Sequence, residues 1–206
     1  LRLTSESDGS PTLTPAVETT DDGATWVMWT EDPDHSGQSD VVVRRIDPDG
    51  VPGERRVLST TTNQFTGSVA LAPLPGGDVR VAYTSSMGAV LEERRLTPAT
   101  TGEPTALYDK STTDKGNVSA GSVRVLAAPG GASWVTLGLP NSGTPAVVAR
   151  RIASDDSVGA VATLSQSAYE YGAAVDPSGR VIFAVASGGQ GRMVLVPVDA
   201  AATVGT

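Results

Sequence analysis

The chain has no cysteine and only one histidine, His35, among its 206 residues. The lack of cysteine excludes disulfides, thiolate catalysis and cysteine zinc sites, and a single histidine excludes a metal site built from several imidazoles. No apolar run approaches the roughly 20 residues that a membrane helix needs. We therefore expect no disulfide framework and no insertion into a membrane.

Positive charge is also scarce, because 15 lysines and arginines stand against 23 acidic residues and give a net charge of −8. Nucleic acids and anionic surfaces bind clustered cations, so we expect no nucleic-acid partner. Apolar residues make up 39% of the chain and charged residues 18%, which is typical of a folded globular protein. We expect a single domain over residues 1–206, a length that can bury a sizeable core.

What the chain does contain is a repeat. Four segments align without a gap, at 15–31, 69–85, 123–139 and 171–187. Each carries a turn glycine, and these glycines are spaced 54, 54 and 48 residues apart, at Gly23, Gly77, Gly131 and Gly179. Apolar residues stand four and six positions after each glycine. A period of two indicates a strand that follows a tight turn.

A second apolar segment follows in every unit and ends in a polar turn, at 41–50, 90–102, 146–159 and 193–205. In the first three units a further short strand comes next. Four antiparallel strands in about 50 residues resemble a β-propeller blade. The chain is thus similar to bacterial extracellular β-propeller repeat proteins, which implies an all-β propeller of four four-stranded blades. The blade repeats fall at about 8–59, 60–109, 110–165 and 166–206 plus 1–5.

The two ends of the chain predict how the ring closes. The last unit stops at "VGT" without its fourth strand, and the chain begins with an isolated strand, "LRLTS". Joined, these residues fill the same positions as 158–165 in the third unit. We expect residues 1–5 to complete the last blade and close the ring, which removes exposed sheet edges. A ring made from two chains, or part of a larger ring, is the alternative.

Residues 19–26, "TTDDGATW", are similar to the Asp box of sialidases. The corresponding turns of the other units share the glycine but not the acidic residue. The stretch also joins the first and second strands, whereas an Asp box lies at the third turn of a blade. We interpret it as a hairpin whose Gly23 has a positive φ, with the sialidase-like interpretation as the alternative.

The variable connections of such a meander all lie on one side of the disk, here named the variable-loop face. They are the second-to-third strand turns and the blade-to-blade connections, and recognition usually lies in such loops. Flat rings stack on sugars, and amides hydrogen-bond to hydroxyls. The candidate ligand residues of this kind are Phe65, Tyr169, Tyr171, Asn141 and Gln190. For Tyr171, packing between blades is the competing interpretation.

Arg124 interrupts a column of small residues on the predicted first strands, where the other units have Ala16, Ala70 and Gly172. These strands line the central channel of a propeller. A buried unpaired guanidinium is costly, so Arg124 needs a carboxylate, an anion or channel water. We include it among the ligand-binding candidates. The alternative is a structural ion pair or a side chain that reaches solvent.

The acidic loop at 31–40 provides the metal candidates, Asp32 and Asp34. Calcium takes six to eight oxygen ligands, and such carboxylates could supply some of them. The loop lacks the alternating register of a calcium loop, so a solvated acidic turn is the alternative. We expect no cofactor, with calcium as the metal to test.

These observations predict a non-catalytic binding module of a secreted or cell-surface bacterial protein. The excess of arginine over lysine suggests a bacterial gene. We expect the partner to be a glycan or a protein, and the chain to be a monomer or a dimer. No nucleophile elbow or phosphate loop occurs. A glycoside hydrolase or polysaccharide lyase that uses loop carboxylates is the alternative, as is a structural domain of a larger surface protein.

Overall fold

The computed structural model describes residues 3, 10–11, 15–32, 39–61, 68–85, 90–109, 123–139, 146–165, 171–187 and 192–205. Apart from two 3-10 turns, Pro75–Gly77 and Pro129–Gly131, the regular elements in these ranges are strands. Within the same ranges no helix is long and apolar enough to cross a membrane. The protein is therefore all-β, as the repeat predicts.

The strands form four antiparallel sheets, which we number blades 1 to 4 along the chain. Blade 1 consists of β2 (Ala16–Thr19), β3 (Thr25–Asp32), β4 (Ser39–Ile46) and β5 (Arg56–Thr61), with the short β1 (Ser10–Pro11) added to β3. Blade 2 consists of β6 (Val69–Pro73), β7 (Val79–Ser85), β8 (Val90–Leu96) and β9 (Thr105–Asp109). Blade 3 consists of β10 (Arg124–Ala127), β11 (Ser133–Leu139), β12 (Ala146–Ile152) and β13 (Val158–Ser165). Blade 4 consists of β14 (Tyr171–Val175), β15 (Val181–Ser187) and β16 (Arg192–Val198).

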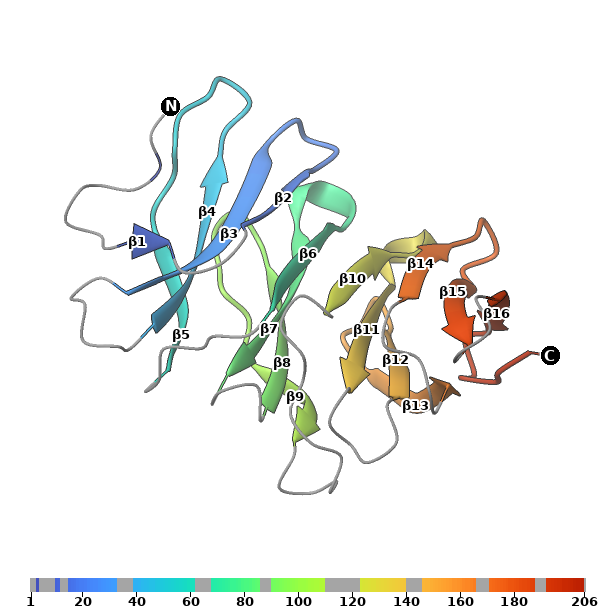
Figure 1. The fold of residues 1–206 in the computed structure, drawn as a ribbon. Helices are drawn as coiled ribbons and strands as arrows, with labels where there is room; N and C mark the ends of the chain where they lie inside the picture. The colour runs from blue at the N-terminus through green and yellow to red at the C-terminus, as the bar shows by residue number, and fades with distance from the viewer. Residues whose placement is uncertain are drawn as a thin grey trace.

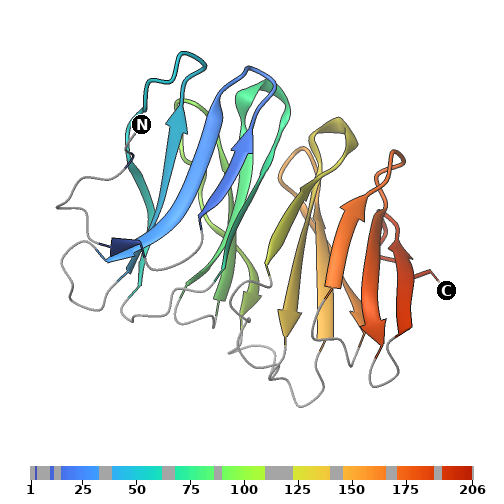
Figure 2. The same cartoon turned by 45° about the horizontal axis from the view of Figure 1, so that its top comes forward.

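The blades stand side by side in a fan, with the N-terminus at blade 1 and the C-terminus at blade 4 (Figures 1 and 2). The first strands are neighbours, β2 beside β6, β6 beside β10, and β10 beside β14. They form the inner side of the fan, and the later strands of each blade follow outward. This arrangement places the first strands where a propeller has its channel.

The expected closed ring is not seen. Blade 4 has three strands, and the described residues contain no fourth strand for it. Leu3, the described residue of the predicted closing segment, lies at the other end of the fan, where it packs with Val27, Trp29 and Val42 of blade 1. The rest of residues 1–5 lies outside the described residues. The structure therefore shows four sheets but no closed sheet.

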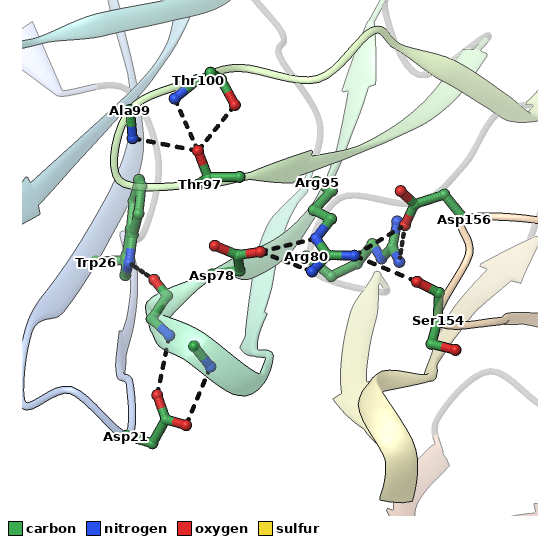
Figure 3. A network of polar contacts seen from close by, with 12 residues as sticks. Asp21, Trp26, Asp78, Arg80, Arg95, Thr97, Ala99, Thr100, Ser154 and Asp156 are labelled. Carbon is green, nitrogen blue, oxygen red and sulfur yellow. Dashed lines mark hydrogen bonds and ion pairs between the residues drawn. The ribbon is translucent and has the colours of Figure 1, made fainter.

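Two tryptophans at the same position of β3 and β11 join their blades to the next ones. Trp26 and Trp134 have no exposed surface. The Nε1 group of Trp26 donates to the carbonyl of Gly77 at 3.2 Å (Figure 3). That of Trp134 donates to the carbonyl of Gly179 at 3.1 Å. Each ring thus fills the apolar layer between two blades while its N–H satisfies the turn glycine of the neighbour.

The turn at residues 19–26 is a hairpin, as interpreted from the sequence. Gly23 has a φ of 82°, which favours glycine because it has no side chain. Asp22 accepts hydrogen bonds from the Thr20 hydroxyl at 2.6 Å and the Ala24 amide at 3.1 Å. Asp21 accepts from the Gly77 amide of blade 2 at 3.0 Å. The two acidic residues therefore stabilise the turn and attach it to the next blade.

Blade 2 carries Arg80 at the position of the two tryptophans, and this arginine is completely buried. Its Nη1 donates to Glu93 on β8 at 2.9 Å. Its Nη2 donates to Asp156 in a turn of blade 3 at 2.6 Å (Figure 3). Burial of Glu93 raises its pKa, and the neighbouring Arg80 acts in the opposite direction. Between blades 2 and 3 an ion-pair network therefore replaces the aromatic contact.

We predict that Arg80→Met destabilises the protein by about 3 to 5 kcal/mol, because it leaves the buried Glu93 carboxylate without its cation. Replacing both partners removes the uncompensated charge, so the variant with Arg80→Met and Glu93→Met should recover most of that loss. Urea unfolding measures both effects, with the exposed Val161→Ala as a control expected within about 0.5 kcal/mol of the parent. A double variant no more stable than Arg80→Met alone would contradict this explanation.

Acid should weaken the short turns first. Hydrogen bonds lower the pKa of the Asp22 and Asp176 carboxyls to about 2. The main donors are Thr20 for Asp22 and Ser178 for Asp176. A carboxyl whose pKa is lower in the folded than in the unfolded chain stabilises the fold above about pH 4. This contribution is lost as the pH falls toward 2. With Asp22→Asn and Asp176→Asn combined, the urea midpoint should be lower at pH 7 and decrease less between pH 4 and pH 2. Parallel decreases in parent and variant would show that these carboxyls do not carry the effect.

Candidate functional site

The candidate site is the variable-loop face, where first and third strands begin and second strands end. The described short turns lie together on the opposite side of the fan (Figure 2). The connections of the variable-loop face lie outside the described residues, at 33–38, 62–67, 86–89, 110–122, 140–145, 166–170 and 188–191. The structure therefore shows the strand ends that form the base of the site.

Most of the predicted ligand residues belong to those connections. Phe65, Asn141, Tyr169 and Gln190 lie outside the described residues. Tyr171 is the first residue of β14, and its backbone stands opposite Val185. The structure thus places Tyr171 at the base of the variable-loop face, and the grouping of these five residues stays a prediction.

Arg124 is the first residue of β10, one of the four inner strands, and stands opposite Thr136 of β11. Its side chain is exposed, so its charge carries no cost of burial. The equivalent residues on the other inner strands are Ala16, Ala70 and Gly172, as the sequence alignment predicts. The structure therefore presents an exposed cation among small residues on the inner side of the fan, at the variable-loop end.

The predicted metal ligands are only partly described. Asp32 is the last residue of β3, half-buried and opposite Ser10 of β1, and Asp34 lies outside the described residues. Among the residues that the structure describes, no group of three or more His, Asp or Glu side chains could hold a metal ion. Calcium binding by the 31–40 loop stays a prediction.

A buried carboxylate at the same end of blade 1 was not predicted. Glu31 is 1% exposed and accepts hydrogen bonds from Trp29 Nε1 at 2.7 Å and from Arg55 Nε at 2.8 Å. Arg55 also reaches Asp40 at 3.2 Å. Burial works against the charge on Arg55, but its bonds to Glu31 raise its pKa above the ordinary value.

Both oxygens of Glu31 are therefore occupied, one by Trp29 and the other by Arg55. A carboxylate held in this way anchors the end of β3. The sequence contained one signal for the hydrogen bond between Trp29 and Glu31. The two residues are two positions apart on one strand, so their side chains lie on the same face of the sheet. The arginine partner, 24 residues away, could not be identified from spacing.

No protein-family model matches the chain, and no curated protein sequence matches it. Solved structures do. A protein of unknown function from Dyadobacter fermentans superposes with a TM-score of 0.61 at 13% identity, over 96% of this chain and 68% of its own. An α-L-arabinanase from Penicillium chrysogenum, complexed with arabinobiose, gives a TM-score of 0.57 at 13% identity, over 89% and 64%. An endo-arabinase from Bacteroides thetaiotaomicron gives 0.54 at 15% identity, over 97% and 79%.

The two arabinanases are five-bladed β-propellers. At identities of 13 to 15% the likeness concerns the fold alone, and the chain spans 64 to 79% of the length of these structures. The comparisons thus agree with the sheet topology. This chain is an all-β protein of the propeller type, with four antiparallel sheets arranged as blades.

Proposed function

We propose that the chain is a glycan-binding module of the propeller type, which engages its ligand at the variable-loop face. The observation that carries this proposal is the exposed Arg124, placed among small residues where the inner strands begin. The likeness of the fold to two arabinanases adds support, because one of them is complexed with a sugar, arabinobiose.

The chemistry of the face suits a sugar. A guanidinium presents five N–H donors in a planar fork, which can hydrogen-bond to neighbouring hydroxyls or to a carboxylate. Ala16, Ala70 and Gly172 have little side chain to obstruct a ligand beside Arg124. The predicted aromatic and amide residues would add stacking and hydrogen bonds. They are Tyr171 at the start of β14 and, in the connections, Phe65, Tyr169, Asn141 and Gln190. The net charge of −8 favours a neutral glycan over a polyanion.

Glycoside hydrolysis is the second candidate, and the likeness to two arabinanases favours it. Hydrolysis needs two carboxyl groups about 5 to 9.5 Å apart. Of the carboxylates described at the variable-loop face, Glu31 has both oxygens occupied, Asp40 accepts from Arg55 and Thr60, and Asp32 and Asp109 end strands of blades 1 and 2. A catalytic pair would draw on these strand ends or on carboxylates of the connections, such as Asp34.

The wider setting that we propose follows from the same argument. A module that recognises glycans would act outside the cell, as a secreted or cell-surface bacterial protein. We propose one domain over residues 1–206 with four blades in a ring, as a monomer or a dimer. Calcium, if it binds, would do so through Asp32 and Asp34.

The test is binding to a glycan array that includes arabinobiose and longer arabino-oligosaccharides, followed by titration calorimetry on each positive glycan. Arg124→Ala should weaken binding about 10-fold or more, since hydrogen bonds to charged groups contribute about 1.5 to 3 kcal/mol. Phe65→Ala and Tyr169→Ala should each weaken it as well. Arg180→Ala is the matched control, because Arg180 is an exposed arginine of a described short turn.

The outcomes separate the candidates. Equal loss in Arg124→Ala and Arg180→Ala would place the ligand elsewhere, and an array without a specific signal would overturn glycan binding. Arg124→Ala should keep the urea midpoint of the parent, because exposed substitutions usually change stability by less than about 0.5 kcal/mol. Release of reducing sugar from arabinan by the parent chain would establish the hydrolase instead.

A further inference from the structure

The outer edges of the sheets are the places where another chain can add a strand. In blades 1 to 3 the outer edge is the fourth strand, which is β5, β9 or β13. The three segments align without a gap from one glycine in each blade, Gly53, Gly102 and Gly159. An edge strand pairs with other strands unless charged residues, proline or short length prevent it.

The outer edges of blades 1 and 2 are protected in this way. The two positions after the glycine are Glu54 and Arg55 in blade 1, and Glu103 and Pro104 in blade 2. Both glutamates are exposed. A charged residue or a proline at these positions opposes the addition of a further strand. The last described strand of blade 4 also carries a proline, Pro197.

The outer edge of blade 3 has neither charge nor proline at these positions. They are Ala160, which is exposed, and Val161, which is 48% exposed. β13 is also the longest of the three fourth strands, with eight residues against six in β5 and five in β9. Among the fourth strands that the structure describes, β13 is therefore the unprotected edge.

The pairing of β13 with β12 shows which part of this edge is regular. Two bulges interrupt the pairing, one on each side of the stretch Val161–Thr163. Within this stretch the pairing is continuous, and Ala162 stands at its centre, opposite Ala149. A two-fold axis through Ala162 therefore pairs the regular stretch with the same stretch of another copy.

We propose that β13 is a self-association edge, which pairs antiparallel with β13 of a second copy about an axis at Ala162. The pairing joins two four-stranded sheets into one sheet of eight strands. Val161 then stands opposite Thr163 of the second copy, and the two side chains lie on the same face. The contact covers the exposed valine and pairs the backbone groups of both edges.

The distribution of charge identifies a second copy as the occupant. Each chain has a net charge of −8, so two copies repel one another where charged surfaces meet. From Ser157 to Ser165 no side chain is charged, so pairing along this segment sets no like charges opposite each other. Two-fold dimers are the commonest oligomers. A single strand pair buries less than a standard interface, so we expect a weak dimer whose population rises with concentration.

The antiparallel arrangement fixes how the two copies face. β13 runs from the short turn at 153–157 to the variable-loop face, where it ends at Ser165. In the second copy it runs the opposite way, so the two variable-loop faces point in opposite directions. Such a dimer would bridge two glycan-bearing surfaces, a consequence that rests on the proposed function. The dimer itself is measured without a ligand, so self-association and glycan binding can fail independently.

Sedimentation velocity over a series of protein concentrations tests the edge. The parent should shift from the mass of one chain to that of two as the concentration rises. Ala160→Glu with Val161→Arg gives blade 3 the Glu-Arg sequence of blade 1, and should raise the dissociation constant about 10-fold or more, because charge opposes edge pairing. Its urea midpoint at low concentration should stay near that of the parent, since blade 1 carries the same residues at the equivalent positions.

The matched control makes the same two exchanges away from the edge. Ala99→Glu with Val51→Arg changes exposed residues of described short turns and should leave the dissociation constant unchanged. The mass of one chain at every concentration would overturn self-association and leave the edge to a strand of a different protein. A dimer that persists equally in the Ala160→Glu, Val161→Arg variant would place the contact on another surface.

A disulfide tests the register, because the chain has no cysteine of its own. Chains with Val161→Cys, mixed with differently tagged chains with Thr163→Cys, should form a mixed disulfide-linked dimer under mild oxidation. Either variant alone sets its two thiols on a diagonal of the strand pair, which suits a disulfide poorly, and should link more slowly. Faster linking within either variant alone than between the two would contradict the axis at Ala162.

Discussion

The contact between successive blades is the interaction on which the rest of the structure depends. Each sheet has two apolar faces, and a sheet is stable only when its apolar faces are covered. Val41 and Val43 of β4 pack toward blade 2, whereas Val42 between them packs with Leu3 on the other side. The blades therefore pack as a series, and each one completes the core of its neighbour.

One position of the second strand determines the chemistry of each contact. Trp26 and Trp134 fill it with an aromatic ring that also hydrogen-bonds to the next turn, and Arg80 fills it with an ion-pair network. In blade 4 the position is Ile182, which is only partly buried. A tightly joined series of this kind holds the inner strands in place, which positions Arg124 at the variable-loop end. The proposed function uses this rigidity, since loops on a fixed base can vary without loss of the fold.

Much of the fold could be predicted from local patterns. The turn glycines, the alternation of apolar residues and the order of strands are properties of short segments, and the structure confirms four sheets with Gly23 at a positive φ. The position of Arg124 on an inner strand was also predictable, because the repeats align without gaps. The partners of Glu31 and Arg80 were not, since they come from different strands and, in the case of Asp156, from a different blade. The predicted ligand residues Phe65 and Tyr169 lie outside the described residues, in segments whose sequence has no strand pattern.

The sequence by itself therefore determined the repeat, the strands and the turns, because backbone preferences and side-chain alternation act over a few residues. The tertiary structure decided which polar groups meet between blades and where the first residues of the chain lie. Arg44 shows the difference most clearly. In sequence it is one of two adjacent arginines on a strand, and only the packed structure shows that it binds the carbonyl of Leu3, 41 residues away. Contacts of that range depend on how whole sheets pack, which is a property of the assembled core.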